Sequence, residues 1–195
     1  MIDEIRRLLE TPDPALAERV VSAERPWHGK IYDVETDEVV CPDGSHGYRE
    51  IARHHGGAGV AAVKDGKICL VRQWRVSAGR MTLEIPAGRL DEGETPDVCA
   101  ARELSEETGY VADRVELVAH SMGAIGFTDE CTHVYRAIGL HKSDAHPDEG
   151  EFVGIVWLPV GDVVEAIHAG LIRDSKTIVA AFDAALRMAG EGADC

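Results

Sequence analysis

Long apolar runs, paired cysteines and positive charge are scarce in this sequence. No apolar run reaches the ~18 residues that a membrane-spanning helix needs, since the longest candidates, 59–63 and 155–160, are strand-sized. Lys and Arg number 20 against 35 Asp and Glu, which gives a formal net charge of -15 at pH 7. A field of that sign repels phosphate backbones and anionic lipids, so no nucleic acid polymer and no membrane is expected as a partner. A small anionic substrate remains compatible with this charge if a divalent cation mediates the contact.

The cysteines are odd in number and widely spaced, and none belongs to a C-x-x-C pair. They are Cys41, Cys69, Cys99, Cys131 and Cys195. Neither a disulfide framework nor a zinc site made of thiolates fits that pattern. The N-terminus mixes acidic residues into its first turn, unlike a secretory signal or a typical transit peptide. We therefore expect reduced thiols and a cytoplasmic location.

The length of 195 residues suits one well-buried domain with a small extension. We predict a helix and strand extension over 1–55, a main domain over 56–190 and a short tail over 191–195. Within the extension, residues 1–25 read as helical, with a break at Thr11-Pro12-Asp13-Pro14. Short strands are expected to follow over 30–36, 38–41 and 48–52.

The clearest predicted helix covers residues 95–108. Thr95 is its expected N-cap, Pro96 suits the first helical position, and Gly109 can close the C-terminus. Strands are expected on both sides of this helix, over 59–63, 67–73, 82–85, 116–121, 132–139 and 152–159. Two helices are expected to end the chain, over 161–169 and over 175–189 with Ser175 as its cap. This order predicts an α/β (α+β) fold, a mixed sandwich of sheet and helices.

The segment 88–110, GRLDEGETPDVCAARELSEETGY, carries the residues with the strongest chemical signal. Glu103 and Glu107 are four apart and Glu106 is three from Glu103, so the three project from one side of a helix. Like charges at those spacings destabilise a helix slightly unless something neutralises them. A hard divalent cation does so, because Mg²⁺ prefers oxygen ligands and bridges to phosphate. The backbone carbonyl of Ala87 could be one more ligand.

This segment resembles the Nudix box, whose pattern is Gly, five residues, Glu, seven residues, and Arg-Glu-aliphatic-x-Glu-Glu-x-Gly-bulky. The fixed positions are matched without a gap by Gly88, Glu94, Arg102, Glu103, Leu104, Glu106, Glu107, Gly109 and Tyr110. A solvated acidic helix face is the plainer interpretation of such a charge run, and the complete pattern outweighs it. The resemblance implies a Nudix hydrolase, an α/β/α sandwich with a mixed sheet that cleaves a nucleoside diphosphate linked to another group.

The resemblance also implies roles for the residues of the box. Glu103 and Glu107 would be the main Mg²⁺ ligands, with Glu106 nearby and the Ala87 carbonyl completing the site; Mn²⁺ is a possible substitute. Arg102 would orient the carboxylates through salt bridges. The metal would lower the pKa of a bound water that attacks the pyrophosphate.

Similarity to the ADP-ribose pyrophosphatase branch of this family extends over roughly residues 29–188. The segments that carry it are 71–75 (VRQWR), 83–88 (LEIPAG), 126–130 (GFTDE), 148–153 (DEGEFV) and 170–177 (GLIRDSKT). One position departs from the pattern: Ile125 stands where the branch usually has proline, which would stiffen the loop near the terminal ribose.

The branch implies Mg²⁺-dependent hydrolysis of ADP-ribose, or a related ADP-sugar, to AMP and ribose 5-phosphate. One alternative is another nucleoside diphosphate-sugar or dinucleotide pyrophosphatase, acting on GDP-mannose or NADH. A second alternative, from another class, is a non-catalytic Nudix sensor that binds ADP-ribose.

Four residues outside the box are candidates for catalysis or substrate binding. Glu151 is the first candidate for the general base and Glu149 the second, because both lie in a loop that could close over substrate. A solvated acidic loop explains the pair equally well. Arg75 is expected to contact phosphate, or else to form an ion pair at a strand edge. Glu84 precedes the Pro-Ala-Gly turn and could contact metal-bound water or accept the loop's hydrogen bonds.

The extension supplies two further substrate-binding candidates, Trp27 and Arg49. Trp27 could stack on adenine, or it could pack at a subunit interface instead. In the resembling branch, such extensions form strands that exchange between subunits and build part of the adenine pocket. A homodimer that binds a small nucleotide-sugar is therefore expected from the resemblance.

Overall fold

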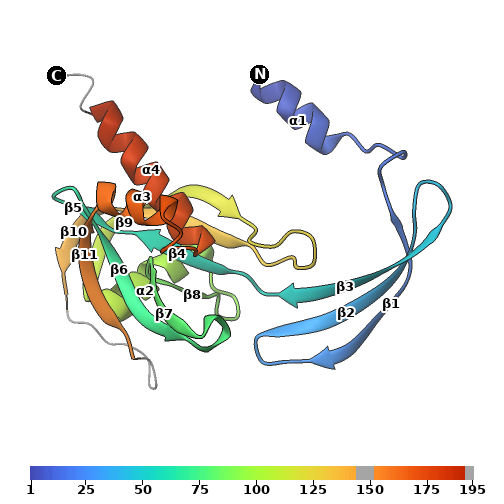
Figure 1. The fold of residues 1–195 in the computed structure, drawn as a ribbon, viewed down its shortest axis with the longest axis horizontal. Coiled ribbons are helices and arrows are strands. Elements are labelled where there is room, and N and C mark those ends of the chain that lie inside the picture. The colour runs from blue at the N-terminus through green and yellow to red at the C-terminus, as the bar shows by residue number, and fades with distance from the viewer. Residues whose placement is uncertain (144–151, 192–195) are drawn as a thin grey trace. The chain divides into compact units, whose positions relative to one another are not determined.

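The structure is a computed structural model that describes residues 1–143 and 152–191 (Figure 1). The chain divides into two compact units. The first, here the N-terminal unit, consists of residues 1–54 together with 124–129. The second, here the C-terminal unit, holds residues 55–123 and the chain from residue 130 onward.

The N-terminal unit contains one helix and a three-stranded antiparallel sheet of order β1-β2-β3. Its elements are α1 (Ile2–Glu10), β1 (Arg19–His28), β2 (Tyr32–Val40) and β3 (His46–His54). Alternate residues of β2, namely Glu35, Asp37 and Val39, are buried on one face of this sheet. All ten residues of β1 are exposed.

Two predictions for this unit are wrong. The helix expected over 1–25 ends at Glu10, and residues 19–28 form β1 instead. The Thr-Pro-Asp-Pro break stops the helix, and the β-branched Val20 and Val21 then suit an extended chain. The two strands expected over 30–36 and 38–41 are one continuous strand, because its buried face passes without interruption through Asp37.

The described residues of the C-terminal unit form two sheets (Figure 1). One has the order β8-β4-β10-β9, and it is mixed because β4 and β10 run parallel while the other pairs are antiparallel. The other has the order β11-β6-β5, with β7 paired to β6. The strands are β4 (Gly57–Ala61), β5 (Val63–Lys64), β6 (Lys67–Arg75), β7 (Arg80–Glu84), β8 (Ala87–Arg89), β9 (Tyr110–Ser121), β10 (Thr132–Lys142) and β11 (Gly154–Pro159), with a 3-10 turn at Val76–Ala78.

The described residues of this unit also form three helices and two apolar clusters. The helices are α2 (Pro96–Thr108), α3 (Val160–His168) and α4 (Ser175–Glu191). Neighbouring residues of the fully buried strand β4 point to opposite faces: Val60 packs in a cluster with Leu104 of α2, whereas Ala61 packs in a cluster with residues of α3 and α4. This two-sided packing confirms the predicted mixed α+β architecture.

Local sequence signals set several of the element ends. Helix α2 has Thr95 at the N-cap position, Pro96 in its first turn and Gly109 in the left-handed region at φ 67°, as predicted. At α4, however, Asp174 and not Ser175 is the cap, since the Thr177 amide donates to Asp174 Oδ2 over 3.1 Å. Strand β8 was not predicted; it forms because the start of the box pairs with β4.

The structure also bears on two features of the composition, the apolar character of the helices and the state of the cysteines. Among residues 1–143 and 152–191, no helix has the length and apolar character to cross a membrane. The four cysteines in the described part of the chain are free thiols. Burial raises the pKa of Cys69 and of Cys99 to about 12, so both thiols stay protonated at neutral pH.

Candidate active site

The box begins at β8, whose backbone passes directly over the side chains of α2. Gly88 lies against the Glu103 carboxylate so closely that a Cβ at this position would overlap it. Any other residue at position 88 would therefore displace the Glu103 carboxylate from its present position. The adjacent Ala87 amide donates to Glu107 Oε2 over 2.9 Å. Two of the predicted metal-binding residues, Ala87 and Glu107, are thus neighbours in space.

The Arg102 guanidinium holds the other box carboxylates together. Its Nη1 donates to Glu103 Oε1 over 2.7 Å and to Glu106 Oε2 over 2.9 Å. Its Nε and Nη2 donate to the two carboxylate oxygens of Glu94 over 2.9 and 3.0 Å. Nη2 also donates to the Arg89 carbonyl of β8, which attaches the helix to the strand that precedes it.

This arrangement shifts the protonation equilibria of the box. Hydrogen bonds from Arg102 lower the pKa of Glu94 to about 2, so this carboxylate stays ionised. The hydrogen bonds to Glu94 raise the pKa of Arg102 in turn, and the hydrogen bonds to Glu106 and Glu103 raise it further. Glu103 and Glu107 are 8% and 5% exposed, which keeps two carboxylates close together with little access to water.

The residues of the box fit a hard divalent cation. Three carboxylates bond to one guanidinium and Glu107 lies beside Ala87, so negative charge is in excess within this group. Carboxylate and carbonyl oxygens are the ligands that Mg²⁺ prefers. The close approach at Gly88 places the Glu103 carboxylate against the backbone of β8, the strand that begins with Ala87.

Glu84 lies at the centre of a second group of charged residues, at the end of β7. Its Oε1 accepts hydrogen bonds from Arg75 Nε and Thr82 Oγ1, both over 2.8 Å. Its Oε2 accepts from Arg75 Nη2 over 2.8 Å and from Lys176 Nζ over 2.7 Å. Glu84 is 4% exposed, so this carboxylate is buried and fully engaged by protein donors.

The structure thus brings together the predicted residues Arg75 and Glu84, and it adds Lys176 to them. Asp174 Oδ1 also accepts from Lys176 Nζ over 2.8 Å. The buried Thr177 hydroxyl donates to Asp174 and accepts from the Ile85 amide over 2.8 Å. Lys176, Asp174 and Thr177 belong to the 170–177 motif of the sequence. Their role depends on the contact of α4 with β7, which the sequence alone does not show.

The remaining predicted site residues lie outside these two groups. Trp27 and Arg49 belong to the N-terminal unit. There the Trp27 ring contacts that of Tyr32, with centroids 5.3 Å apart, and Arg49 pairs with Glu18. The two candidates for the general base, Glu149 and Glu151, lie outside the described residues.

The family profile described as NUDIX domain matches residues 53–181, which is more than half of the chain. The chain belongs to the Nudix family. The matched range contains the complete box and the Glu84 group. This confirms the resemblance drawn from the sequence.

Relatives of this Nudix protein resemble it over most of its length. It is 39% identical over 166 residues to the methanol dehydrogenase activator of Bacillus methanolicus, covering 84% of this chain and 90% of the relative. It is 36% identical over 169 residues to an ADP-ribose pyrophosphatase of Bacillus subtilis (strain 168), covering 85% and 91%. A crystal structure of an ADP compounds hydrolase shares the fold, with a TM-score of 0.79, 19% identity, and coverage of 91% of this chain and 97% of that one.

The Glu84 group should make stability depend on acidity in a defined range. Burial raises the pKa of Glu84, but the bonds from Arg75 and the charge and bond of Lys176 outweigh burial and hold this pKa at about 2. Because the folded pKa lies below the ordinary value of 4.5, the contribution is complete above about pH 4.5 and is lost as the pH falls toward 2. We expect Glu84→Gln to lower the free energy of unfolding by about 1–3 kcal/mol at pH 7.

Urea unfolding of the wild type and of Glu84→Gln, at intervals from pH 7 to pH 3, measures this difference. The difference should shrink below about pH 4.5, because the Glu84 carboxyl of the unfolded wild-type chain then binds a proton that the folded protein does not bind. The exposed Glu92 provides the matched control, Glu92→Gln, which should unfold like the wild type at each pH. A difference that stays constant down to pH 3 would contradict the assigned role of Glu84.

Proposed function

We propose that this protein hydrolyses the pyrophosphate of ADP-ribose, or of a related ADP-sugar, to AMP and ribose 5-phosphate with Mg²⁺. The observation that carries this proposal is the arrangement of the box carboxylates, with Glu94, Glu103 and Glu106 bonded to Arg102 and Glu107 bonded to the Ala87 amide. The substrate is suggested by relatives named ADP-ribose pyrophosphatase, which are 36% identical in Bacillus subtilis and in Mycobacterium tuberculosis.

Glu103, Glu107 and the Ala87 carbonyl would hold the Mg²⁺ ion, with Glu106 beside them; Mn²⁺ would fit the same oxygen ligands. When bound, the ion neutralises charge on the pyrophosphate and lowers the pKa of a water molecule that attacks phosphorus. Arg102 acts through the carboxylates, because its guanidinium fixes the directions of Glu103 and Glu106.

Glu84 would serve as a positioning residue for cationic side chains. Its two oxygens already accept four hydrogen bonds, from Arg75, Lys176 and Thr82, so it has little capacity left for the substrate. Arg75 is 42% exposed in its side chain and keeps donors that can face a phosphate. We therefore retain Arg75 as the phosphate-binding residue and assign Glu84 to its orientation.

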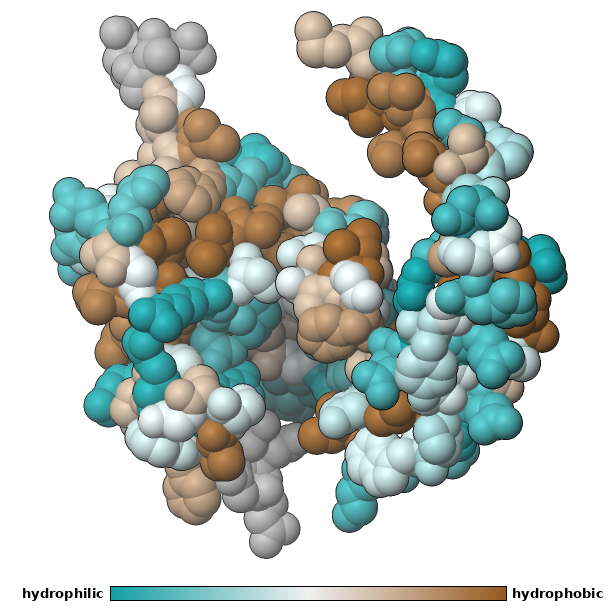
Figure 2. Space-filling model, turned by 45° about the vertical axis from the view of Figure 1, so that its right-hand side comes forward, coloured by the Kyte–Doolittle hydropathy of each residue, from teal (hydrophilic) through white to brown (hydrophobic). Residues whose placement is uncertain are grey.

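The N-terminal unit would form the contact of a homodimer and part of the adenine pocket. Its strand β1 is exposed along its whole length, and within the described residues only β2 pairs with it. Figure 2 shows apolar side chains gathered along α1, where Ile2, Ile5, Leu8 and Leu9 are all more than half exposed. Sedimentation equilibrium of the full chain tests this assembly, and a monomer at micromolar concentration would contradict it.

The predicted compartment remains the cytoplasm. The free thiols of the described cysteines suit a reducing environment. A cell fractionation assay with antibody against the chain would check this location.

A second candidate substrate is GDP-mannose. The chain is 30% identical over 169 residues to a GDP-mannose pyrophosphatase of Yersinia pestis, covering 78% of the chain and 80% of the relative. The same box could cleave either compound, because the metal and the pyrophosphate are common to both. A purely sensory role is disfavoured, since all carboxylates of the box are present.

A panel of ADP-ribose, ADP-glucose, GDP-mannose and NADH, each with Mg²⁺, tests the proposal. We expect the largest kcat/KM for ADP-ribose, with AMP and ribose 5-phosphate as products identified by chromatography. A larger kcat/KM for GDP-mannose, with GMP released, would overturn the substrate assignment and leave the pyrophosphatase assignment intact. No cleavage of any compound with Mg²⁺ or Mn²⁺ would overturn both.

The metal assignment leads to a mutational prediction at Glu107. Glu107→Gln keeps the size of the side chain and its acceptor for the Ala87 amide, but removes the charge that a cation needs. We expect kcat to fall by at least about a hundredfold, because charge stabilisation at the pyrophosphate is lost. Glu92→Gln is the matched control within the same segment and should retain full activity. Full activity of Glu107→Gln would refute the assignment.

The general base is tested by paired substitutions at Glu151 and Glu149. If Glu151 is the base, Glu151→Gln should lower kcat by roughly 10²–10⁴-fold, and the acidic limb of its kcat–pH profile should disappear. Glu149→Gln should then change kcat little. Mg²⁺ affinity, measured by titration calorimetry, should be the same in both variants. The reverse order of the two effects would transfer the role to Glu149.

A further inference from the structure

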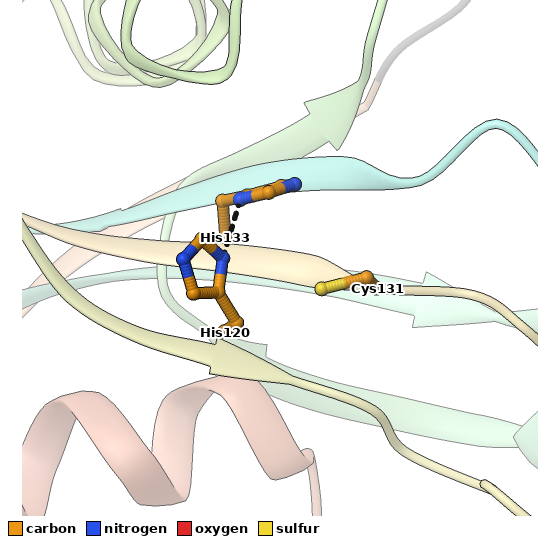
Figure 3. A group of neighbouring side chains, drawn as sticks. All are labelled: His120, Cys131 and His133. Carbon is orange, nitrogen blue, oxygen red and sulfur yellow. Dashed lines mark hydrogen bonds between the residues drawn. The ribbon is translucent and has the colours of Figure 1, made fainter. Parts of the chain in front are cut away.

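Three potential metal ligands lie together on the mixed sheet of the C-terminal unit, and none of them belongs to the box. They are His120 on β9, His133 on β10, and Cys131, which directly precedes β10 (Figure 3). One ligand atom from each lies within 4.8 Å of the other two. The two Nδ1 atoms are 2.9 Å apart, and the rings meet edge to face with centroids 4.8 Å apart.

The backbone of the sheet holds these three side chains in place. His120 and His133 are direct partners in the antiparallel pairing of β9 with β10. Cys131 precedes His133 by two residues, the spacing that brings side chains to the same side of an extended chain. The Cys131 carbonyl also accepts a hydrogen bond from the Gly57 amide of β4 over 3.1 Å. The cluster therefore comes from regular pairing of strands and needs no rearrangement of the backbone.

We propose that His120, Cys131 and His133 form a binding site for a thiophilic transition metal ion, Zn²⁺ in particular. Two imidazoles and one thiolate are ligands of the kind that bind Zn²⁺, and they leave a fourth position for water. In a tetrahedral Zn²⁺ site with the usual bond lengths, neighbouring ligand atoms are roughly 3.3–3.6 Å apart. Small rotations of the three side chains would bring their ligand atoms to these separations, since the atoms already lie within 4.8 Å of one another. Mg²⁺ prefers oxygen ligands, so the two sites of this protein would select different ions.

Metal binding requires a lone pair from each imidazole and loss of the proton from the Cys131 thiol. In the free site, one Nδ1 donates its proton to the other. On binding, that proton moves to Nε2 of the same ring, both Nδ1 lone pairs turn to the ion, and the Cys131 thiol releases one proton to solvent.

An ion at this site would link the end of β9 to the start of β10, which are the two ends of the connection between these strands. Residues 122–131 form that connection, which includes the motif 126–130 noted in the sequence. Within it, the Thr128 hydroxyl donates to the Ala52 carbonyl over 2.8 Å, and Asp129 accepts from the His54 amide over 2.9 Å. Bound Zn²⁺ would therefore stabilise the ends of the connection that carries these contacts.

Cobalt substitution tests the site directly, because Co²⁺ takes the place of Zn²⁺ and is visible by absorption. Metal-free full-length protein, kept in excess Mg²⁺ to occupy oxygen ligands, is titrated with Co²⁺. We expect one equivalent to bind, with a thiolate-to-cobalt charge-transfer band in the near ultraviolet and strong visible bands typical of four ligands. Added Zn²⁺ should abolish the bands by displacing Co²⁺. Absence of the charge-transfer band in the wild type would overturn the proposal.

Matched variants show which side chains bind the ion. Cys131→Ser should lose the charge-transfer band, and His120→Asn and His133→Asn should weaken Co²⁺ binding by about tenfold or more. The controls are Cys41→Ser in the N-terminal unit and His141→Asn at the far end of β10, both of which should bind like the wild type. Circular dichroism verifies the folding of each variant. A band that survives in Cys131→Ser, or disappears in Cys41→Ser, would refute the ligand assignment.

Thiol alkylation gives an independent measurement on the wild type. Zn²⁺ should protect Cys131 from iodoacetamide at least tenfold, as read by peptide mass spectrometry, while Cys41 reacts at an unchanged rate. Cys69 and Cys99 are fully buried and should not react in either case. Equal alkylation of Cys131 with and without Zn²⁺ would contradict the proposal. ADP-ribose cleavage by Cys131→Ser with Mg²⁺ should equal that of the wild type, which separates this site from the proposed function.

Discussion

The geometry of the box depends on one guanidinium surrounded by carboxylates. Without Arg102, the glutamates of α2 would repel each other, and the loop before the helix would lose its bonds through Glu94 and the Arg89 carbonyl. A lysine could not replace it, because a single ammonium has no planar fork that reaches several carboxylates in fixed directions. The protein itself thus fixes the arrangement of negative charge in the box, and part of the acidity of the whole chain has a local structural purpose.

Glu84 plays the opposite electrostatic role, as one buried anion that organises cations. It joins Arg75 at the end of β6 to Lys176 at the start of α4, two elements separated by about a hundred residues of chain. Asp174 and Thr177 support the same junction, since one caps α4 and the other bonds to the Ile85 amide. A buried carboxylate is costly unless it is fully bonded, and here every oxygen has donors. The two groups therefore place anions and cations at separate, fixed positions.

The sequence predicted the box well because its chemistry is local. Helical spacing alone places Glu103, Glu106 and Glu107 on one side of α2, and the structure has this helix where it was expected. Features that depend on distant pairing were missed. The role of Lys176 depends on the contact of α4 with β7, which the sequence does not show. For β1, the pairing with β2 decides that the chain after the Thr-Pro-Asp-Pro break is extended and not helical. The His120 cluster also depends on distant pairing. Cys131 and His133 have the spacing of a strand in the sequence, but only the register of β9 with β10 brings His120 next to them.

The glycines of β4 have a consequence for how this protein can change by mutation. A Cβ at Gly57 would come within 2.6 Å of the Gly88 carbonyl, and one at Gly59 within 2.9 Å of Ile85. The missing side chains let β4 approach the strand that begins the box. An alanine at position 57 would require a shift between the backbones of β4 and β8, whereas at position 59 the Ile85 side chain would have to turn away. New specificity could therefore evolve more easily through an exposed loop position such as Ile125 than through Gly57, where a side chain meets the backbone that begins the box.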